Sequence, residues 1–176
     1  MYDIDKIRKD FPELDIFVNN RPNIFLDTAA SALKPWVVIE KMADIMSSKY
    51  ANVHRGAYTL SEQITFEFEQ ARDMVCHFVG AKNSKEIVFT RNATEAINLV
   101  ASTWGRQNLR PGDEVLISEA EHHANLVTWQ VLRDELGFTL KVFKIGDDGS
   151  FIMDEYLKCL NEKTKLVAVT AMSNVL

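Results

Sequence analysis

A first group of residues that could do chemistry lies at positions 90–95, where a strand-like run gives way to a helical pattern. The free backbone N–H groups and the dipole of a helix start favour a bound phosphate, and the hydroxyl of Thr94 could add a donor. Asn92 and Glu95 offer an alternative, an ordinary capping box without a ligand, which this segment taken alone favours. The glycines of a Walker loop or a dinucleotide fingerprint are missing.

Two adjacent histidines, His122 and His123, follow the next strand-like run. Neighbouring residues of a helix point about 100° apart, so both rings cannot easily bind one metal ion. Glu119 and Glu121 lie nearby, but we expect no metal site. One imidazole could face a pocket while the other packs or caps the helix, and two capping histidines at the surface are an equal alternative.

Three further positions could contact a ligand. Asn174 follows the last strand-like run, where an amide can bind a ligand hydroxyl, although a plain turn residue is the usual interpretation. His54 and Arg55 lie in an irregular but ordered loop and could meet an anionic substrate, with a solvated loop as the alternative. Cys76 and Cys159 lie in helical apolar patterns, so we expect buried structural thiols rather than nucleophiles.

The elements that must position these residues alternate between strand and helix in the second half of the chain. We expect strands at the apolar runs 86–90, 114–118, 139–145 and 166–171, and helices at 94–104, 122–136 and 154–160. This alternation predicts an α/β fold with a mostly parallel sheet and helices on both faces. Ligands of such sheets bind where strands end and helices begin, and the candidate residues at 90–95, 122–123 and 174 lie at such junctions.

The first part of the chain predicts a helical segment. We expect helices at 3–11, 36–49 and 61–79, and a short strand at 24–26. Ser61 is the expected N-cap of the third helix, and Gly80 its end. Because no repeat or linker interrupts the sequence, we expect a single domain over residues 1–176, in which a helical segment of about 1–50 leads into the remainder.

Composition and charge narrow the classes of function. The chain has 176 residues, of which 47% are hydrophobic and 26% charged, a profile typical of a soluble globular protein. Its 20 Lys and Arg against 25 Asp and Glu give a net charge of −5, so a nucleic acid is not an expected partner. The apolar runs are too short to span a membrane, and no secretory signal is visible. With only two cysteines, a cytoplasmic location is expected.

Eight segments, taken together, point to one family. They are residues 25–32, 50–56, 59–61, 91–101, 104–106, 111–115, 121–125 and 173–176. In this order and spacing the chain resembles the N-terminal part of the SufS-type, or group II, cysteine desulfurases, which are class-V aminotransferases with the type I pyridoxal-phosphate fold. The resemblance implies the conversion of L-cysteine to L-alanine, with the sulfur passed to an enzyme persulfide. An acceptor protein of iron–sulfur cluster assembly would then take that sulfur.

The resemblance also implies a cofactor, pyridoxal 5′-phosphate, and roles for single residues. Ala93 and Thr94 match the helix start that holds the cofactor phosphate. His122 matches the histidine that stacks on the pyridine ring and can move protons. Asn174 matches the asparagine beside the 3-oxygen of the cofactor.

On the substrate side, Ala29, His54 and Arg55 match residues that line the family's pocket. Two positions depart from the family pattern, because Tyr58 and Ala171 stand where histidine is common. Neither position is a cofactor contact in the match, so these departures leave the resemblance intact and are expected to change only the pocket wall or an interface.

Family members are longer than this chain. Their Schiff-base lysine and nucleophilic cysteine lie beyond the match to Leu176, as do an aspartate and an arginine of the site. The resemblance therefore implies an incomplete large domain, inactive alone and associating with itself or a partner through the strand edge at 166–171. Selenocysteine lyase, or another class-V aminotransferase relative, is an alternative, and so is a binding module without enzymatic activity.

Overall fold

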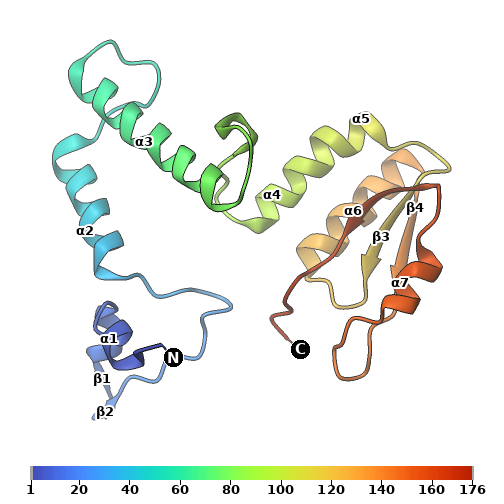
Figure 1. The fold of residues 1–176 in the computed structure, drawn as a ribbon, viewed down its shortest axis with the longest axis horizontal. Coiled ribbons are helices and arrows are strands. Elements are labelled where there is room, and N and C mark those ends of the chain that lie inside the picture. The colour runs from blue at the N-terminus through green and yellow to red at the C-terminus, as the bar shows by residue number, and fades with distance from the viewer. Residues whose placement is uncertain (1, 176) are drawn as a thin grey trace. The chain divides into compact units, whose positions relative to one another are not determined.

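The computed structural model describes residues 2–175, which fall into two compact units, one ending at Val88 and the other beginning at Phe89. Figure 1 shows the course of the chain through both units. Each unit has its own set of elements. The single incomplete domain expected from the sequence stays a prediction.

The N-terminal unit is mainly helical. Its helices are α1 (Ile4–Arg8), α2 (Trp36–Asp44) and α3 (Thr59–Phe78), with a π-helical turn η2 (Ile45–Lys49), 3-10 turns η1 (Pro12–Asp15) and η3 (Ser84–Glu86), and the antiparallel pair β1 (Phe17–Val18) and β2 (Arg21–Pro22). The helices predicted at 3–11 and 36–49 are confirmed, the first as a shorter helix. Its N-cap is Asp3, whose carboxylate accepts a hydrogen bond from the N–H of Lys6 at 3.0 Å.

Two predictions for the N-terminal unit need correction. Helix α3 begins at Thr59, so Ser61 lies inside the helix, buried, and its hydroxyl donates to the carbonyl of Asn52 at 2.6 Å. The strands predicted at 24–26 and 86–90 are wrong, because neither segment pairs with a strand among residues 2–175. An apolar run can have the residue types typical of a strand. It becomes a strand only when another segment of the fold lies beside it and forms the backbone hydrogen bonds of a sheet. Gly80, with φ of 72°, follows α3 as predicted.

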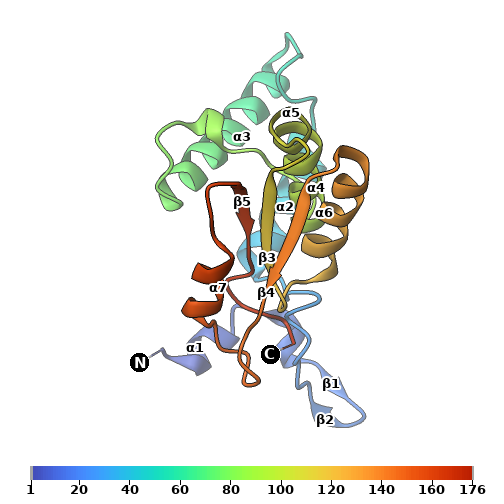
Figure 2. The same cartoon turned by 90° about the vertical axis from the view of Figure 1, so that its right-hand side faces the viewer.

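The C-terminal unit is built on a parallel three-stranded sheet with the order β4-β3-β5. The strands are β3 (Glu114–Ser118), β4 (Thr139–Phe143) and β5 (Thr164–Ala168), and the helices are α4 (Ala93–Val100), α6 (His123–Leu136) and α7 (Met153–Cys159), with α4 continued by the π-helical turn η4 (Ala101–Gly105) and α5 (Arg106–Asn108). Helices α6 and α7 lie on opposite sides of the sheet (Figure 2). The predicted α/β fold is therefore confirmed.

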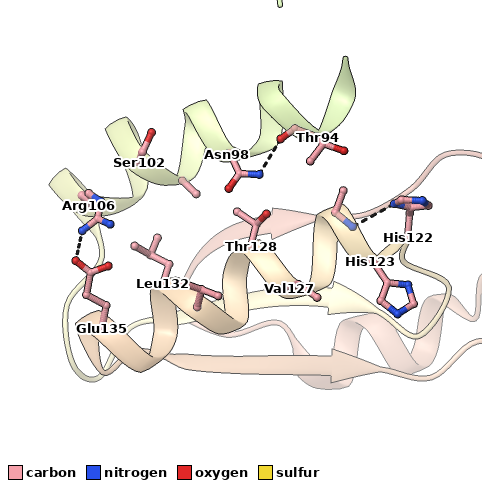
Figure 3. A pocket seen from close by; sticks show the side chains of 13 residues that line it. Thr94, Asn98, Ser102, Arg106, His122, His123, Val127, Thr128, Leu132 and Glu135 are labelled. Atoms are coloured by element: carbon pink, nitrogen blue, oxygen red, sulfur yellow. Dashed lines mark hydrogen bonds and ion pairs between the residues drawn. The ribbon is translucent and has the colours of Figure 1, made fainter. Parts of the chain in front are cut away.

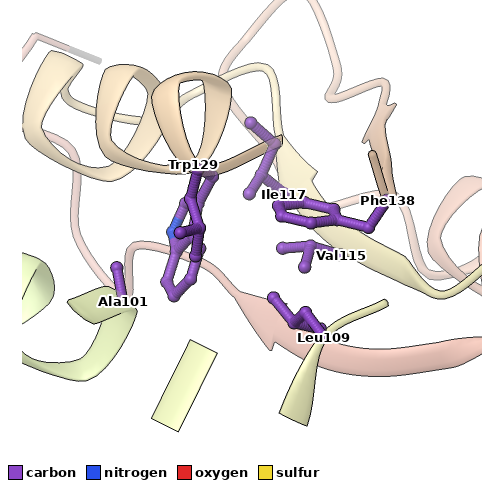
Figure 4. Close-up of a cluster of buried hydrophobic side chains, with 7 residues drawn as sticks. Ala101, Leu109, Val115, Ile117, Trp129 and Phe138 are labelled. Atoms are coloured by element: carbon purple, nitrogen blue, oxygen red, sulfur yellow. The ribbon is translucent and has the colours of Figure 1, made fainter. Parts of the chain in front are cut away.

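Strand β3 is central, and all five of its residues are buried. Val115 and Ile117 project toward α6 and pack with Trp129 and Leu132 of that helix, while Leu109 closes the same cluster (Figure 4). Because successive side chains of a strand alternate between faces, the residues between them serve the opposite face. This burial on both faces explains why the sequence of β3 has no polar alternation.

Helix α6 shows how local signals fix an element's ends. His122 is its N-cap, and Gly137 follows with φ of 77°, its N–H donating to the carbonyl of Arg133 at 2.7 Å. A left-handed glycine at this place satisfies a carbonyl of the last turn at no steric cost. The predicted helix 122–136 is thus confirmed, whereas the last strand is Thr164–Ala168 rather than 166–171.

Candidate functional site

The start of α4 combines a cap with free donors. The side-chain oxygen of Asn92 accepts the N–H of Glu95 at 2.8 Å, and the Glu95 carboxylate accepts the N–H of Arg91 at 2.6 Å. The expected cap by Asn92 is therefore confirmed, but Glu95 binds the N–H of Arg91 instead of that of Asn92, so the pair is not the capping box that was expected. Within the described chain, the N–H groups of Ala93 and Thr94 still have no acceptor, so they remain available to an anion.

The carboxylate of Glu95 is paired with the neighbouring Arg91. The pKa of Glu95 lies below its usual value because its carboxylate accepts the backbone N–H of Arg91 and then a bond from the Arg91 guanidinium. This carboxylate is therefore already paired. It places less net negative charge beside the free N–H groups of α4 than an unpaired glutamate would.

His122 both caps α6 and faces open space. Its Nδ1 accepts the N–H of Ala124 at 3.1 Å, which assigns the proton of the neutral ring to Nε2 (Figure 3). The His123 ring lies 6.4 Å away, centre to centre, at 83°. The two rings thus do not converge on one ion, and residues 2–175 contain no group of three or more His, Cys, Asp or Glu suited to a metal.

Two hollows meet at His122. The first, of about 520 Å³, lies along α4 and α6 and is lined by Thr94, Asn98, His122 and His123, among others (Figure 3). The second, of about 400 Å³, is lined by the same two histidines together with Ser173 and Asn174. Thr94 and Asn174 therefore line different hollows, and His122 is the predicted site residue that both share.

Thr94 and Asn174 themselves are exposed. The sequence places three site residues after three strands, and two of these strands exist, since His122 follows β3 and Asn174 follows β5. Thr94 follows an unpaired segment instead. The crevice at the strand ends is thus formed by two strands of the sheet together with a helix start.

Sequence reasoning missed the role of Glu121, which it weighed only as a metal ligand. Its carboxylate accepts hydrogen bonds from Ser118 at the end of β3, from Asn125 of α6 and from the N–H of Thr170 after β5. Two of these partners are near in sequence, since Ser118 and Asn125 lie three and four residues from Glu121. The contact with Thr170 joins segments distant in sequence.

The residues matched to the substrate side belong to the N-terminal unit. His54 has φ of 74°, in the left-handed region, and its N–H donates to the hydroxyl of Thr65 at 2.8 Å. Its Nε2 lies 3.4 Å from a carboxylate oxygen of Glu69. The loop is therefore ordered, as predicted, and tied to α3. That Ala29, His54 and Arg55 line the same pocket as His122 stays a prediction.

The two cysteines differ in burial. Cys76 is 5% exposed and its thiol lies 3.4 Å from the carbonyl oxygen of Ala81, which confirms a buried thiol. Cys159 is only half-buried at the end of α7, so the prediction of burial is wrong in part there. Across the described residues, no helix has the length and apolarity that crossing a membrane requires.

Comparison with known proteins places this chain in a family. The family model described as aminotransferase class-V matches residues 24–176. A cysteine desulfurase of Dickeya dadantii (strain 3937) is 50% identical over 175 residues, which are 99% of this chain and 42% of that protein. The chain therefore belongs to the class-V aminotransferase family. It spans less than half the length of this relative.

Two solved structures give the same picture of the fold. The apo structure of a cysteine desulfurase from Thermococcus onnurineus NA1 has a TM-score of 0.86 and 36% identity, covering 99% of this chain and 41% of that one. A cysteine desulfurase from Escherichia coli has a TM-score of 0.77 and 31% identity, covering 99% and 42%. The arrangement of elements described above is thus shared with proteins of this class.

Proposed function

We propose that this chain supplies the phosphate and ring contacts of a pyridoxal-phosphate site in a SufS-type cysteine desulfurase. The observation that carries the proposal is that two hollows share His122 in their lining, one also lined by Thr94 at the start of α4 and the other by Asn174. Its support is the class-V match over 24–176 and the similarity to cysteine desulfurases. The proposed reaction converts L-cysteine to L-alanine and passes the sulfur to an enzyme persulfide.

The donors at the start of α4 fit a phosphate. The N–H groups of Ala93 and Thr94 and the Thr94 hydroxyl have no partner among the described residues, and they belong to a helix whose dipole favours an anion. We propose that these three donors bind the cofactor phosphate. When bound, pyridoxal phosphate supplies an electron sink that stabilises negative charge developing on the substrate.

His122 fits a ring contact. Because the N–H of Ala124 engages Nδ1, the imidazole is held in one orientation with Nε2–H directed away from the helix backbone. We propose that one ring face stacks on the pyridine ring and that Nε2 holds or moves a proton. The Asn174 amide, which lines the second hollow with His122, would donate to the ring oxygen.

Partners and surroundings are part of the same proposal. We propose an acceptor protein of iron–sulfur cluster assembly as the recipient of the sulfur, a homo-oligomer as the working state, and a cytoplasmic location. These follow from the resemblance of the segments around Thr94, His122 and Asn174, and from a composition with few cysteines.

The proposal is tested with pyridoxine 5′-phosphate, which has the ring and phosphate of the cofactor but no aldehyde to react with lysines. In ¹⁵N-labelled chain we expect the amide signals of Ala93 and Thr94 and the ring signals of His122 to shift in one titration. Ala93→Pro removes one donor at the first helical position, where proline is well tolerated, and should weaken binding about 10-fold or more.

Met153→Pro is the matched control, because Met153 is the first residue of α7 and is exposed. This variant should bind like the wild type. Shifts confined to other regions would contradict the proposal. Inorganic phosphate binding as tightly as pyridoxine 5′-phosphate would show that the ring is not recognised, which favours a simple phosphate-binding module.

A further inference from the structure

A polar network surrounds the carboxylate of Glu121, the residue before His122. One carboxylate oxygen accepts from the hydroxyl of Ser118 at 2.5 Å and from the N–H of Thr170 at 2.9 Å. The other accepts from the side-chain amide of Asn125 at 2.7 Å. Glu121 thereby connects the end of β3, the segment after β5 and the first turn of α6.

The network continues from Glu121 into the core through Asn125. The Asn125 amide nitrogen also donates to the carbonyl of Ala168 at 3.1 Å, and its oxygen accepts from the indole N–H of Trp129 at 3.0 Å. These partners fix which end of the amide is oxygen, since the opposite orientation would set donor against donor. Trp129 is 2% exposed, so the network is anchored in the rigid centre of the unit.

The two residues proposed to contact the cofactor ring lie at the two sides of this network. His122 directly follows Glu121, and Thr170 begins the segment that leads to Asn174. Asn174 is exposed, and within its segment the hydroxyl of Thr170 donates to the carbonyl of Met172 at 3.0 Å. The bond from the N–H of Thr170 to Glu121 joins this segment to the residue just before the N-cap of α6.

We propose that Glu121 is a positioning residue, which holds the segment carrying Asn174 at a fixed distance from His122. This inference rests on the proposed function for the identity of the ligand, whereas the hydrogen bonds themselves do not. A carboxylate suits this task because it accepts several hydrogen bonds at once, and bonds to an ionised acceptor are stronger than neutral ones. A site held in advance loses less entropy when the ligand binds.

The first test needs no ligand. Amide hydrogen exchange is compared in the wild type, Glu121→Ala and Glu121→Gln, with Glu155→Gln as control, since the Glu155 side chain bonds only to the surface Lys158 among the described residues. In Glu121→Ala the Thr170 amide should exchange about 10-fold faster or more because its acceptor is gone, while the amides of β3 keep their protection. Glu121→Gln keeps an oxygen for Thr170 and should restore most of the protection.

The second test uses pyridoxine 5′-phosphate as the probe. In Glu121→Ala the amide signals of Ala93 and Thr94 should still respond. The signals of the His122 ring and the Asn174 side-chain amide should no longer shift together in one titration, or should not shift at all. The affinity should fall about 10-fold, because one end of the ligand loses its aligned contacts. A general loss of structure would weaken both ends together, so this split distinguishes positioning from mere destabilisation.

The outcomes separate the two ideas. If the wild type shows no response to pyridoxine 5′-phosphate, the proposed function fails, and the exchange data alone judge Glu121. Equal exchange of Thr170 in wild type and Glu121→Ala overturns the positioning role. If Glu121→Ala does not fold, Glu121→Met, which fills a similar volume without an acceptor for Thr170, replaces it: loss of the His122 and Asn174 responses with intact Ala93 and Thr94 responses supports the role, and unchanged responses overturn it.

Discussion

The two units of this chain differ in the interactions that stabilise each of them internally. In the C-terminal unit every residue of β3 is buried, and the large side chains of Trp129 and Phe143 are buried almost completely beside it. Of the described residues up to Val88, only Ser61, Ile64 and Cys76 are buried. The C-terminal unit is therefore stabilised mainly by removing apolar surface from water, a term that the N-terminal unit can use far less.

Polar ties take a larger share in the N-terminal unit. The hydroxyl of Ser61 donates to the carbonyl of Asn52, the hydroxyl of Thr65 donates to the carbonyl of Ser61, and the N–H of His54 donates back to Thr65. These bonds attach the loop before α3 to the helix. The comparison teaches that a loop carrying candidate substrate residues can be ordered without a large core, provided its backbone groups are satisfied.

The largest effect is expected for the core of the C-terminal unit. Trp129→Ala should lower the free energy of unfolding by about 3–5 kcal/mol, because it opens a cavity and leaves the Asn125 oxygen without its donor. Phe78→Ala is the matched change in the other unit, where the ring is 92% exposed, and should cost almost nothing. Urea unfolding followed by far-UV circular dichroism measures both losses of unfolding free energy. Equal losses in the two variants would contradict the difference between the units.

The next effect concerns the tied loop. A Cβ at Gly56 would lie 2.2 Å from the hydroxyl oxygen of Ser61, so Gly56→Ala must displace the side chain that binds Asn52. We expect a loss of about 1–3 kcal/mol, the usual cost of overpacking. Faster amide exchange of His54 would show it directly. Gly80→Asn is the control, because a Cβ there meets no atom within 4 Å and asparagine tolerates its positive φ. Unchanged exchange of His54 in Gly56→Ala would contradict the tie.

The sequence was most informative where the signals are local. The start and end of helix α6 are marked by His122 and Gly137, so the helix was predictable. The apolar run 114–118 is buried throughout as β3, and it was predictable as a buried strand. The runs 24–26 and 86–90 look similar in the sequence. They form no strand because pairing depends on a neighbour that local sequence does not specify.

The candidate site divides in the same way. The cap formed by Asn92 and Glu95 and the placement of His122 at a helix start follow from residue types within a few positions. The role of Glu121 depends on the N–H of Thr170, and α6, β4, α7 and β5 separate the two residues in the sequence. Such contacts are set by the register of β5 beside β3, and no short-range pattern encodes that register.

A third effect should appear as the pH falls. Glu114 of β3 has a pKa below its usual value, first because Lys141 binds its carboxylate at 2.8 Å and then because the Asn161 amide binds it at 2.7 Å. Its folded pKa lies below its unfolded pKa, so this stabilisation is present above the unfolded pKa and is lost as the pH drops through the folded one.

Glu114→Gln should therefore reduce the acid-induced loss of stability. Urea unfolding between about pH 3 and pH 6 spans the ordinary glutamate range and measures this. The wild type and the variant should converge at the acidic end, where the carboxylate is protonated, and differ most near neutrality. A constant difference across this range would mean that the lost contact is not electrostatic.

The smallest effect is expected for the corresponding pair in the N-terminal unit. The pKa of Glu67 is lowered first by its bond to Lys41, with Lys49 also 3.7 Å away. The sign is the same as for Glu114, but the Glu67 side chain is 29% exposed against 11% for Glu114, so solvent and salt screen it more. Glu67→Gln should flatten the acid response less than Glu114→Gln, and the effect of Glu67→Gln should disappear in about 1 M salt, where the screening length is about 3 Å. A Glu67 effect that is larger than the Glu114 effect, or that persists in high salt, would mean that the N-terminal unit holds a desolvated charge and that its polar ties are as well shielded as the core of the other unit.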